Sequence, residues 1–201
     1  MSKAVMISIR PKWCEKICNG EKTIEVRKTR TKLETPFKCY IYCTMDHPYI
    51  SVSCGELDKL NYRTNTVGRC NGKVIGEFTC DRIDWITHIG YTGIPNLVET
   101  RICDAATMRT SPAGGLLNAA CLTPKMLNDY LAGGDGYGWH ISDLVIYDEP
   151  KELIEFHTWK KCKSCSKSGY ESTACIYDEN CMIPAAITKA PQSWCYVEED
   201  T

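Results

Sequence analysis

The sequence lacks a long apolar run, an excess of charge of either sign, and any Asn-x-Ser/Thr acceptor site for glycosylation. No apolar stretch approaches the roughly 18 residues of a membrane-spanning helix, and residues 1–10 lack the apolar core of a secretory signal. The 24 basic and 25 acidic side chains give a net charge of −1, which excludes a histone-like polycation. We therefore expect a cytoplasmic protein without a membrane partner, in which any anion-binding surface is local.

Cysteine, in contrast, is abundant, with 14 in 201 residues. This share lies just below the roughly 8–10% that marks a small secreted disulfide scaffold, and a chain of this length buries a core without such bridges. Nine of the cysteines are scattered through residues 14–121, whereas five lie in the 34 residues from 162 to 195. The distribution predicts reduced thiols in the first part of the chain and a different role for the second group.

Short alternating segments separated by turn residues predict an α+β chain that is rich in strands. Helices are expected from Pro11 to the Asn19-Gly20 stop, and at 123–132, where Thr123 is a suitable N-cap and Pro124 occupies the first position. Strands are expected at residues 4–9, 22–28, 38–43, 73–80, 82–87 and 139–147. The most economical arrangement is a small curved or closed sheet with helices on its openings.

The strand at 22–28 has an unusual polar face, with Glu25 and Arg27 side by side and Lys22 at the entrance. For an arbitrary strand, such a face is usually solvated and its ion pair contributes less than ~1 kcal/mol. Here a helix stop leads directly into the strand, which favours a position at the mouth of a barrel. A carboxylate and two cations there could orient a nucleobase and meet a phosphate. Strict alternation puts Lys22 on the opposite face, so this convergence requires an irregular start of the strand.

Residues 7–13, Ile-Ser-Ile-Arg-Pro-Lys-Trp, and residues 20–27, Gly-Glu-Lys-Thr-Ile-Glu-Val-Arg, together resemble the start of an ASCH (activating-signal-cointegrator homology) domain. That family has a Gly-x-Lys-x-x-Glu-x-Arg run after its first helix. Residues 73–80 resemble its later barrel strand, and residues 136–147 resemble its closing segment as found in phage and Firmicute members. The resemblance spans about residues 4–155. It implies a PUA-like small β-barrel with flanking helices, which we assign to residues 1–157.

The resemblance also implies a module that binds RNA, a nucleotide or a nucleoside in a charged cleft at the barrel mouth. The expected nucleotide contacts are Arg10, Trp13, Lys22, Glu25, Arg27 and Trp139. For Trp13, packing in the core stays an open alternative. Trp139 is expected to contact the ligand rather than to pack in the core, where it could stack on a base. A third hypothesis is a phage-encoded protein that sequesters a nucleotide signal.

An enzyme is the alternative from another functional class. Some family members hydrolyse N4-acetylcytidine and another is a ribonuclease, which makes Lys22, Glu25 and Glu77 the candidate catalytic residues. Glu77 would be the general base and Lys22 the group that stabilises an oxyanion. Glu25 stands where the amidohydrolases have threonine, which counts against amidohydrolysis. Replacement of Lys22 by alanine is expected to abolish binding or turnover and to leave thermal stability nearly unchanged.

Residues 158–201 form a Cys-rich tail with its own chemistry. Four thiolates at this density in a reducing compartment indicate a structural Zn²⁺ site, for which His157 or Cys195 could replace one ligand. The alternative is a poorly ordered tail with free thiols. The expected zinc ligands are Cys162, Cys165, Cys175 and Cys181, and the lysines among them (160, 161, 163 and 167) either touch phosphates or solvate the tail. Trp194 and Val197 are expected to dock the end of the tail onto the barrel.

Overall fold

Strands outnumber helices in the computed structural model, which describes residues 3–48, 50–53, 56–59, 70–90, 98–104, 110–161 and 182–199. The strands are β1 (Lys3–Ile9), β2 (Ile24–Arg27), β3 (Phe37–Cys43), β4 (Ile50–Ser53), β5 (Glu56–Lys59), β6 (Val74–Cys80), β7 (Ile83–Gly90), β8 (Val98–Asp104), β9 (Thr110–Pro112), β10 (Gly136–His140), β11 (Ser142–Lys151), β12 (His157–Lys161), β13 (Met182–Ala186) and β14 (Trp194–Glu198). The helices are α1 (Pro11–Cys18), α2 (Gly114–Ala119) and α3 (Pro124–Leu131), with one 3-10 turn, η1 (Leu153–Glu155).

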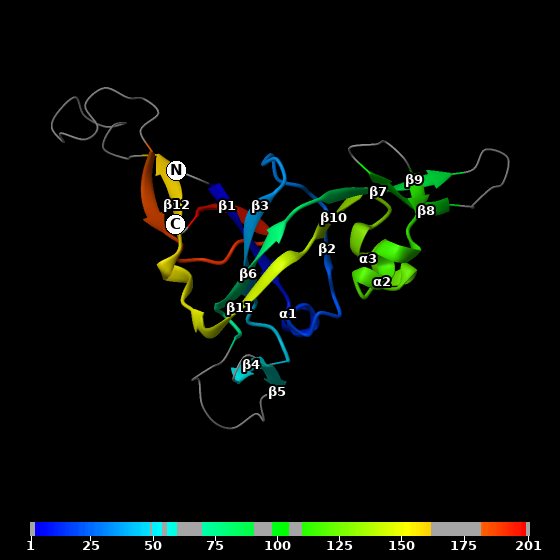
Figure 1. Ribbon diagram of the computed structural model, residues 1–201. Coiled ribbons are helices and arrows are strands. Elements are labelled where there is room, and N and C mark those ends of the chain that lie inside the picture. Colours follow the sequence, from blue (N-terminus) through cyan, green and yellow to red (C-terminus); the bar gives the residue numbers. More distant parts are fainter. Residues whose placement is uncertain are drawn as a thin grey trace.

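Two five-stranded sheets organise these elements (Figure 1), one in the order β11-β6-β3-β1-β14 and the other in the order β2-β10-β7-β8-β9. The chain crosses from one sheet to the other four times: from β1 through α1 to β2, from β2 to β3, from β6 to β7 and from β10 to β11. The described strands thus form two joined sheets with few helices. This agrees with the predicted strand-rich α+β chain, and a closed barrel is not seen among them. The strand expected at 139–147 is divided at Ile141, whose backbone N–H donates to the Thr23 carbonyl at 2.9 Å.

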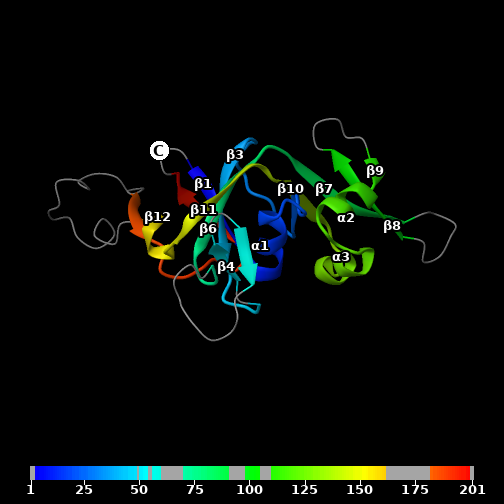
Figure 2. The same ribbon diagram turned by 60° about the horizontal axis from the view of Figure 1, so that its bottom comes forward.

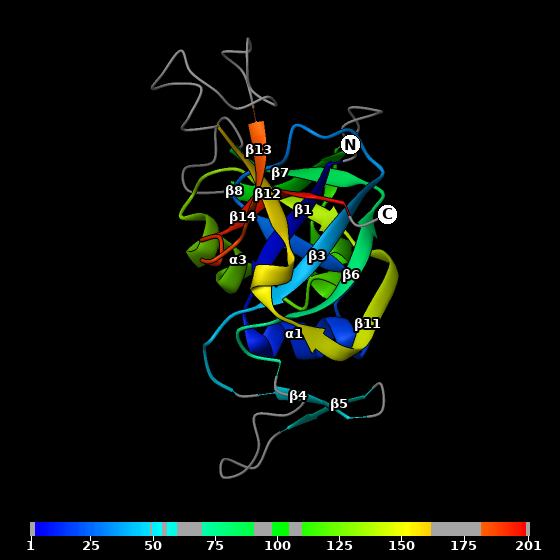
Figure 3. The same ribbon diagram turned by 90° about the vertical axis from the view of Figure 1, so that its left-hand side faces the viewer.

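Three apolar clusters hold the sheets and helices together. The first includes Ile7, Ile41 and Trp139 and contains the inner face of α1. The second covers the other face of the first sheet, where Phe156 packs edge-on against Tyr40, and η1 and β12 lie in front of the sheet (Figure 3). The third joins α2 and α3 to the second sheet, and Figure 2 shows these two helices together beside β7 and β10. The site described below lies where the first cluster meets the second sheet.

Both predicted helices are present, and their ends follow the expected local rules. Gly20, just beyond α1, has φ +73°, a left-handed conformation that glycine adopts without strain. At the start of α3 the Thr123 hydroxyl accepts from the Met126 N–H at 3.2 Å. Of the apolar side chains of α3, Leu127 and Leu131 are buried, whereas Met126 and Tyr130 are exposed. The helix packs on the sheet through a narrower stripe than its apolar residues suggest.

The end of the predicted tail belongs to the first sheet. β14 pairs antiparallel with β1, Val197 is fully buried, and the Trp194 ring lies 5.9 Å from that of Trp139. These contacts confirm the expected docking of Trp194 and Val197. The four predicted zinc ligands lie outside the described residues, so the zinc site stays a prediction. Of the possible substitutes, His157 is exposed at the start of β12 and Cys195 is a free, half-buried thiol.

Among the described residues, none of the helices has the length and apolar character needed to cross a membrane.

Candidate functional site

Three charged side chains are buried together at the start of the second sheet. Lys22, Glu25 and Arg27 are 2%, 6% and 8% exposed. The Glu25 carboxylate forms two ion pairs. Its Oε2 lies 3.2 Å from the Lys22 Nζ, and its Oε1 lies 3.1 Å from a terminal nitrogen of Arg27. We call these three residues the charged cluster. Burial at this level makes it more than a solvated strand face, because unpaired charges would be costly here.

An irregular start of β2 brings Lys22 to the same side as Glu25. Residues 22 and 23 precede the strand, and their backbone N–H groups donate to the carbonyls of Lys16 at 3.0 Å and Ala119 at 2.8 Å. The chain is therefore fixed between α1 and α2 before it becomes extended at Ile24. This removes the alternation that would have sent Lys22 to the opposite face.

The Lys22 ammonium is fully engaged within the chain. Besides Glu25, it donates to the carbonyls of Ile24 at 2.8 Å and Ala120 at 2.9 Å. An ammonium has three protons, so these partners leave none for a ligand. The Ala120 carbonyl, 98 residues away in sequence, was not anticipated because no local pattern marks such a contact. The geometry gives Lys22 a positioning role, in which it ties β2 to α2 and holds Glu25 in place.

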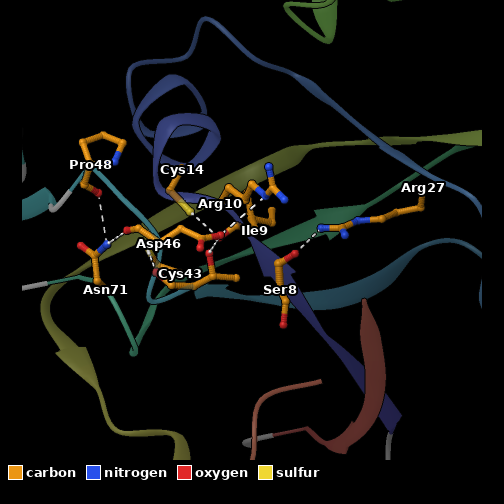
Figure 4. Close-up of polar contacts among 10 residues, drawn as sticks. Ser8, Ile9, Arg10, Cys14, Arg27, Cys43, Asp46, Pro48 and Asn71 are labelled. Atoms are coloured by element: carbon orange, nitrogen blue, oxygen red, sulfur yellow. Dashed lines mark hydrogen bonds and ion pairs between the residues drawn. The ribbon is translucent and has the colours of Figure 1, made fainter. Parts of the chain in front are cut away.

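Two donors beside the cluster are buried and have no partner among the described residues: the Nε of Arg27 and the Nε1 of Trp139. A terminal nitrogen of Arg27 donates to the Ser8 carbonyl at 2.5 Å (Figure 4), so the guanidinium is fixed while its Nε is left over. In the β2–β10 ladder Trp139 lies opposite Glu25, and Tyr137 lies opposite Arg27. These side chains therefore share one face of the second sheet. An unsatisfied buried donor costs about 1–3 kcal/mol, which an acceptor on a ligand would recover.

Aromatic rings surround these donors. Trp139 is fully buried, with the Phe37 ring edge-on at 5.7 Å and the Trp194 ring at 5.9 Å. The expectation that Trp139 stacks on a base needs correction, since its ring is part of the first apolar cluster, and only its Nε1, which lacks a partner, is left for a ligand. Trp13 is half-buried, and the Lys22 Nζ lies 5.2 Å from its ring centre. Tyr196 follows Trp194 on β14 and packs against it at 5.4 Å.

Two predicted site residues lie elsewhere. Arg10 is exposed and pairs with Asp46 at 3.6 Å (Figure 4). Glu77 lies opposite Tyr40 in the β3–β6 ladder, and this places it on the second-cluster side of the first sheet, away from the charged cluster. There it accepts from the Tyr147 hydroxyl at 2.6 Å and pairs with Lys38 at 3.2 Å. The predicted convergence of Glu77 with Lys22 is therefore wrong. Alternation along β6 turns Glu77 to the face of the first sheet that carries the second cluster, whereas Lys22 lies at the start of the second sheet.

The surroundings of Glu77 also make it a poor base. Partial burial by itself would raise the pKa of this carboxyl, but the Tyr147 hydrogen bond and the Lys38 ammonium lower it overall. A lowered pKa stabilises the carboxylate and weakens its affinity for a proton. Its location and its basicity both count against the role that the hydrolase hypothesis gave it.

A second set of charged residues, Arg82, Asp84 and His140, lies where the chain passes between the two sheets. The His140 Nε2 lies 2.8 Å from Asp84 Oδ2, and the Arg82 Nε lies 3.2 Å from Asp84 Oδ1. His140 contacts β7 through this carboxylate, whereas the neighbouring Trp139 points into the first cluster, as alternation predicts. This group joins the segments that enter β7 and leave β10.

The buried thiols of Cys14 and Cys39, next to the charged cluster, are unreactive. Burial raises the pKa of Cys14 well above its usual value, and its hydrogen bond to Cys43 raises it further. Burial likewise raises the pKa of Cys39. Because the thiolate is the reactive form, these side chains act as small apolar residues, as the sequence predicted for this part of the chain.

No family model and no curated protein matches the chain. Among solved structures it is similar to an ASCH protein from Zymomonas mobilis, with 17% identity, coverage of 75% of this chain and 73% of that one, and a TM-score of 0.44. A point mutant of that protein matches with 15% identity, coverage of 98% and 89%, and a TM-score of 0.48. The matched structures are ASCH proteins. This is the family that residues 7–13 and 20–27 resemble, although likeness at this level says nothing about what the present chain binds.

Proposed function

We propose that this protein binds a nucleotide, or a base within RNA, at the face formed by β2 and β10. The observation that carries the proposal is the pair of buried donors without partners, Arg27 Nε and Trp139 Nε1, beside the charged cluster. Carbonyl oxygens of a base, or phosphate oxygens, are acceptors that would complete both donors. Groups of this kind are usually satisfied in folded proteins, so each exception calls for a partner, which we take to be the ligand.

The charge of the site supports a ligand of this class. Two cations share one carboxylate, so the cluster has an excess of one positive charge in an environment that excludes water. Such an excess favours an anionic or electron-rich ligand. The half-buried Trp13 lies beside the cluster, with the Lys12 Nζ 4.5 Å and the Lys22 Nζ 5.2 Å from its ring centre, so a base that stacks on it, at about 1–3 kcal/mol, would take the place of the exposed Lys12 side chain. Binding, rather than hydrolysis, is proposed because Glu77, the general base of the alternative, lies on another face.

The experiment is a binding screen with two matched tryptophan variants. Wild type is titrated with nucleosides, nucleotides and short RNA, and binding is followed by thermal shift and calorimetry. Trp139→Phe removes the unpartnered Nε1 and keeps an aromatic ring, whereas Trp159→Phe makes the same change on β12, away from the site. A lost hydrogen bond of about 1–1.5 kcal/mol should weaken the best ligand roughly 5- to 13-fold in Trp139→Phe.

Trp159→Phe should bind as wild type does. Arg27→Lys, which keeps a positive charge but removes Nε, should weaken the same ligand. Failure of every panel member to stabilise wild type, or equal affinity of Trp139→Phe and wild type, would refute the proposed site. The same incubations are analysed for products, including cytidine from N4-acetylcytidine, and turnover without stabilisation would favour an enzyme.

A further inference from the structure

The loop between β2 and β3 carries three exposed cations. Lys28, Arg30 and Lys32 are exposed, and none of them has an ion-pair partner among the described residues. Several other cations of the described chain are paired: Arg10 with Asp46, Lys16 with Glu21, Lys38 with Glu77, Lys73 with Glu152, and Lys125 with Asp129. In a chain with a net charge of −1, residues 28–32 therefore form a concentrated positive surface. We call these five residues the basic loop.

The backbone of the basic loop is held in place by β14. Thr31 is 1% exposed, and its hydroxyl donates to the Tyr196 hydroxyl at 3.1 Å. The Lys32 N–H donates to the same oxygen at 3.0 Å, and the Trp194 Nε1 donates to the Thr29 hydroxyl at 3.0 Å. The threonines thus anchor the backbone of the loop, while the side chains of its three cations are exposed. A backbone that is already fixed lowers the entropic cost of binding an anion, compared with a mobile loop.

The Tyr196 hydroxyl at this anchor has a lowered pKa. Partial burial would raise the pKa of the Tyr196 hydroxyl, but its hydrogen bonds from Thr31 and the Lys32 N–H, together with the charges of Lys32 and Lys3, lower it overall. A lowered tyrosine pKa means that negative charge is stabilised at this position. Of these causes, the charges of Lys32 and Lys3 also attract a phosphate that approaches the loop.

The basic loop is continuous with the candidate site. β2 ends at Arg27 and the loop begins at the next residue. Trp194 joins the two in space, because its ring contacts Trp139 and its Nε1 binds Thr29. At the other end Lys28 lies 5.4 Å from the ring centre of Tyr130 on α3. A ligand that fills the site would therefore have the basic loop beside it.

We propose that the basic loop binds the phosphodiester backbone of a single-stranded nucleic acid, one base of which occupies the site between β2 and β10. This rests on the proposed function and deepens it, because it makes the ligand a polymer. Each phosphate neutralised on a single strand contributes about −0.7 to the slope of log affinity against log salt, so three cations contribute about −2. A fourfold increase in salt should then weaken the contribution of the loop roughly 20-fold.

The test compares two triple variants of equal charge. Lys28→Gln/Arg30→Gln/Lys32→Gln neutralises the basic loop, and Lys125→Gln/Lys160→Gln/Lys189→Gln removes three exposed cations elsewhere. Anisotropy of a labelled ten-nucleotide RNA and of its DNA equivalent is measured between about 50 and 200 mM salt. The loop variant should lose about two units of salt slope and bind the oligonucleotide more weakly by an order of magnitude or more. The other variant should retain most of the slope.

Mononucleotide affinity separates this inference from the proposed function. The loop variant should bind a mononucleotide as wild type does, because the cluster and Trp139 are unchanged. Wild type that binds a mononucleotide but gains no affinity from a longer strand would overturn the role of the loop and leave the site intact. Equal loss of slope in both triple variants, or binding of anionic vesicles in place of oligonucleotide, would overturn it as well. Absence of both mononucleotide and oligonucleotide binding would refute both.

Discussion

Lys22→Met tests whether the charged cluster holds the fold together. The sequence alone predicted that loss of this lysine would leave stability nearly unchanged. In the structure its ammonium is buried and joins β2 to α2 through the Ala120 carbonyl. Methionine keeps most of the length of the side chain and removes the charge and all three donors. We therefore expect a large loss of stability.

The magnitude follows from the partners left behind. Without Nζ, the carbonyls of Ile24 and Ala120 lose their buried donor, at about 1–3 kcal/mol each. Glu25 keeps Arg27 at 3.1 Å, so its charge is still partly compensated. The sum lies near the ~3–5 kcal/mol observed when one partner of a buried pair is removed. In a domain of this size it lowers Tm by roughly 6–20 °C.

Urea unfolding followed by tryptophan fluorescence measures this change. Glu25→Gln and the double variant Lys22→Met/Glu25→Gln complete a cycle, whose coupling should be about 1–3 kcal/mol because the two groups are in direct contact. Lys16→Met is the control, since the Lys16–Glu21 pair is on the surface and should contribute no more than ~1 kcal/mol. A Lys22→Met variant within about 1 kcal/mol of wild type, or strict additivity in the cycle, would refute the buried arrangement described here.

Three further outcomes are expected. Gly76→Ala should destabilise the fold by about 1–3 kcal/mol, because a Cβ there would overlap the Val145 carbonyl in the β6–β11 ladder, whereas Gly114→Ala, in open space, should have little effect in the same urea assay. Burial raises the pKa of Cys18 to about 12 from 9.0, so the folded thiol keeps a proton that the unfolded chain has lost. Stability should accordingly be constant below about pH 8 and fall between about pH 9 and pH 12, and Cys18→Ala should show a shallower fall in urea unfolding across that range. Metal analysis of the purified protein should find about one zinc per chain, held by residues 162–181, while a zinc-free chain with freely titrating thiols there would contradict the tail hypothesis.

Local signals in the sequence predicted the elements well where one short segment determines the conformation. The proline-led starts of α1 and α3, the Thr123 cap and the left-handed Gly20 depend on neighbouring residues alone. The alternation of residues 38–43 also identified β3. The break between β10 and β11 at Ile141 was missed, because it depends on a hydrogen bond to Thr23, which lies more than a hundred residues earlier.

For the site, the sequence determined which charges are adjacent, and the tertiary structure decided what they contact. The order of residues 20–27 placed Lys22, Glu25 and Arg27 in one segment, and this follows from covalent spacing. Three properties of the site depend on which sheet faces meet. These are the burial of the three side chains, the hydrogen bond from Lys22 to the Ala120 carbonyl, and the position of Glu77 away from the charged cluster. Those faces are set by packing between segments far apart in the chain, for which local pattern carries no information.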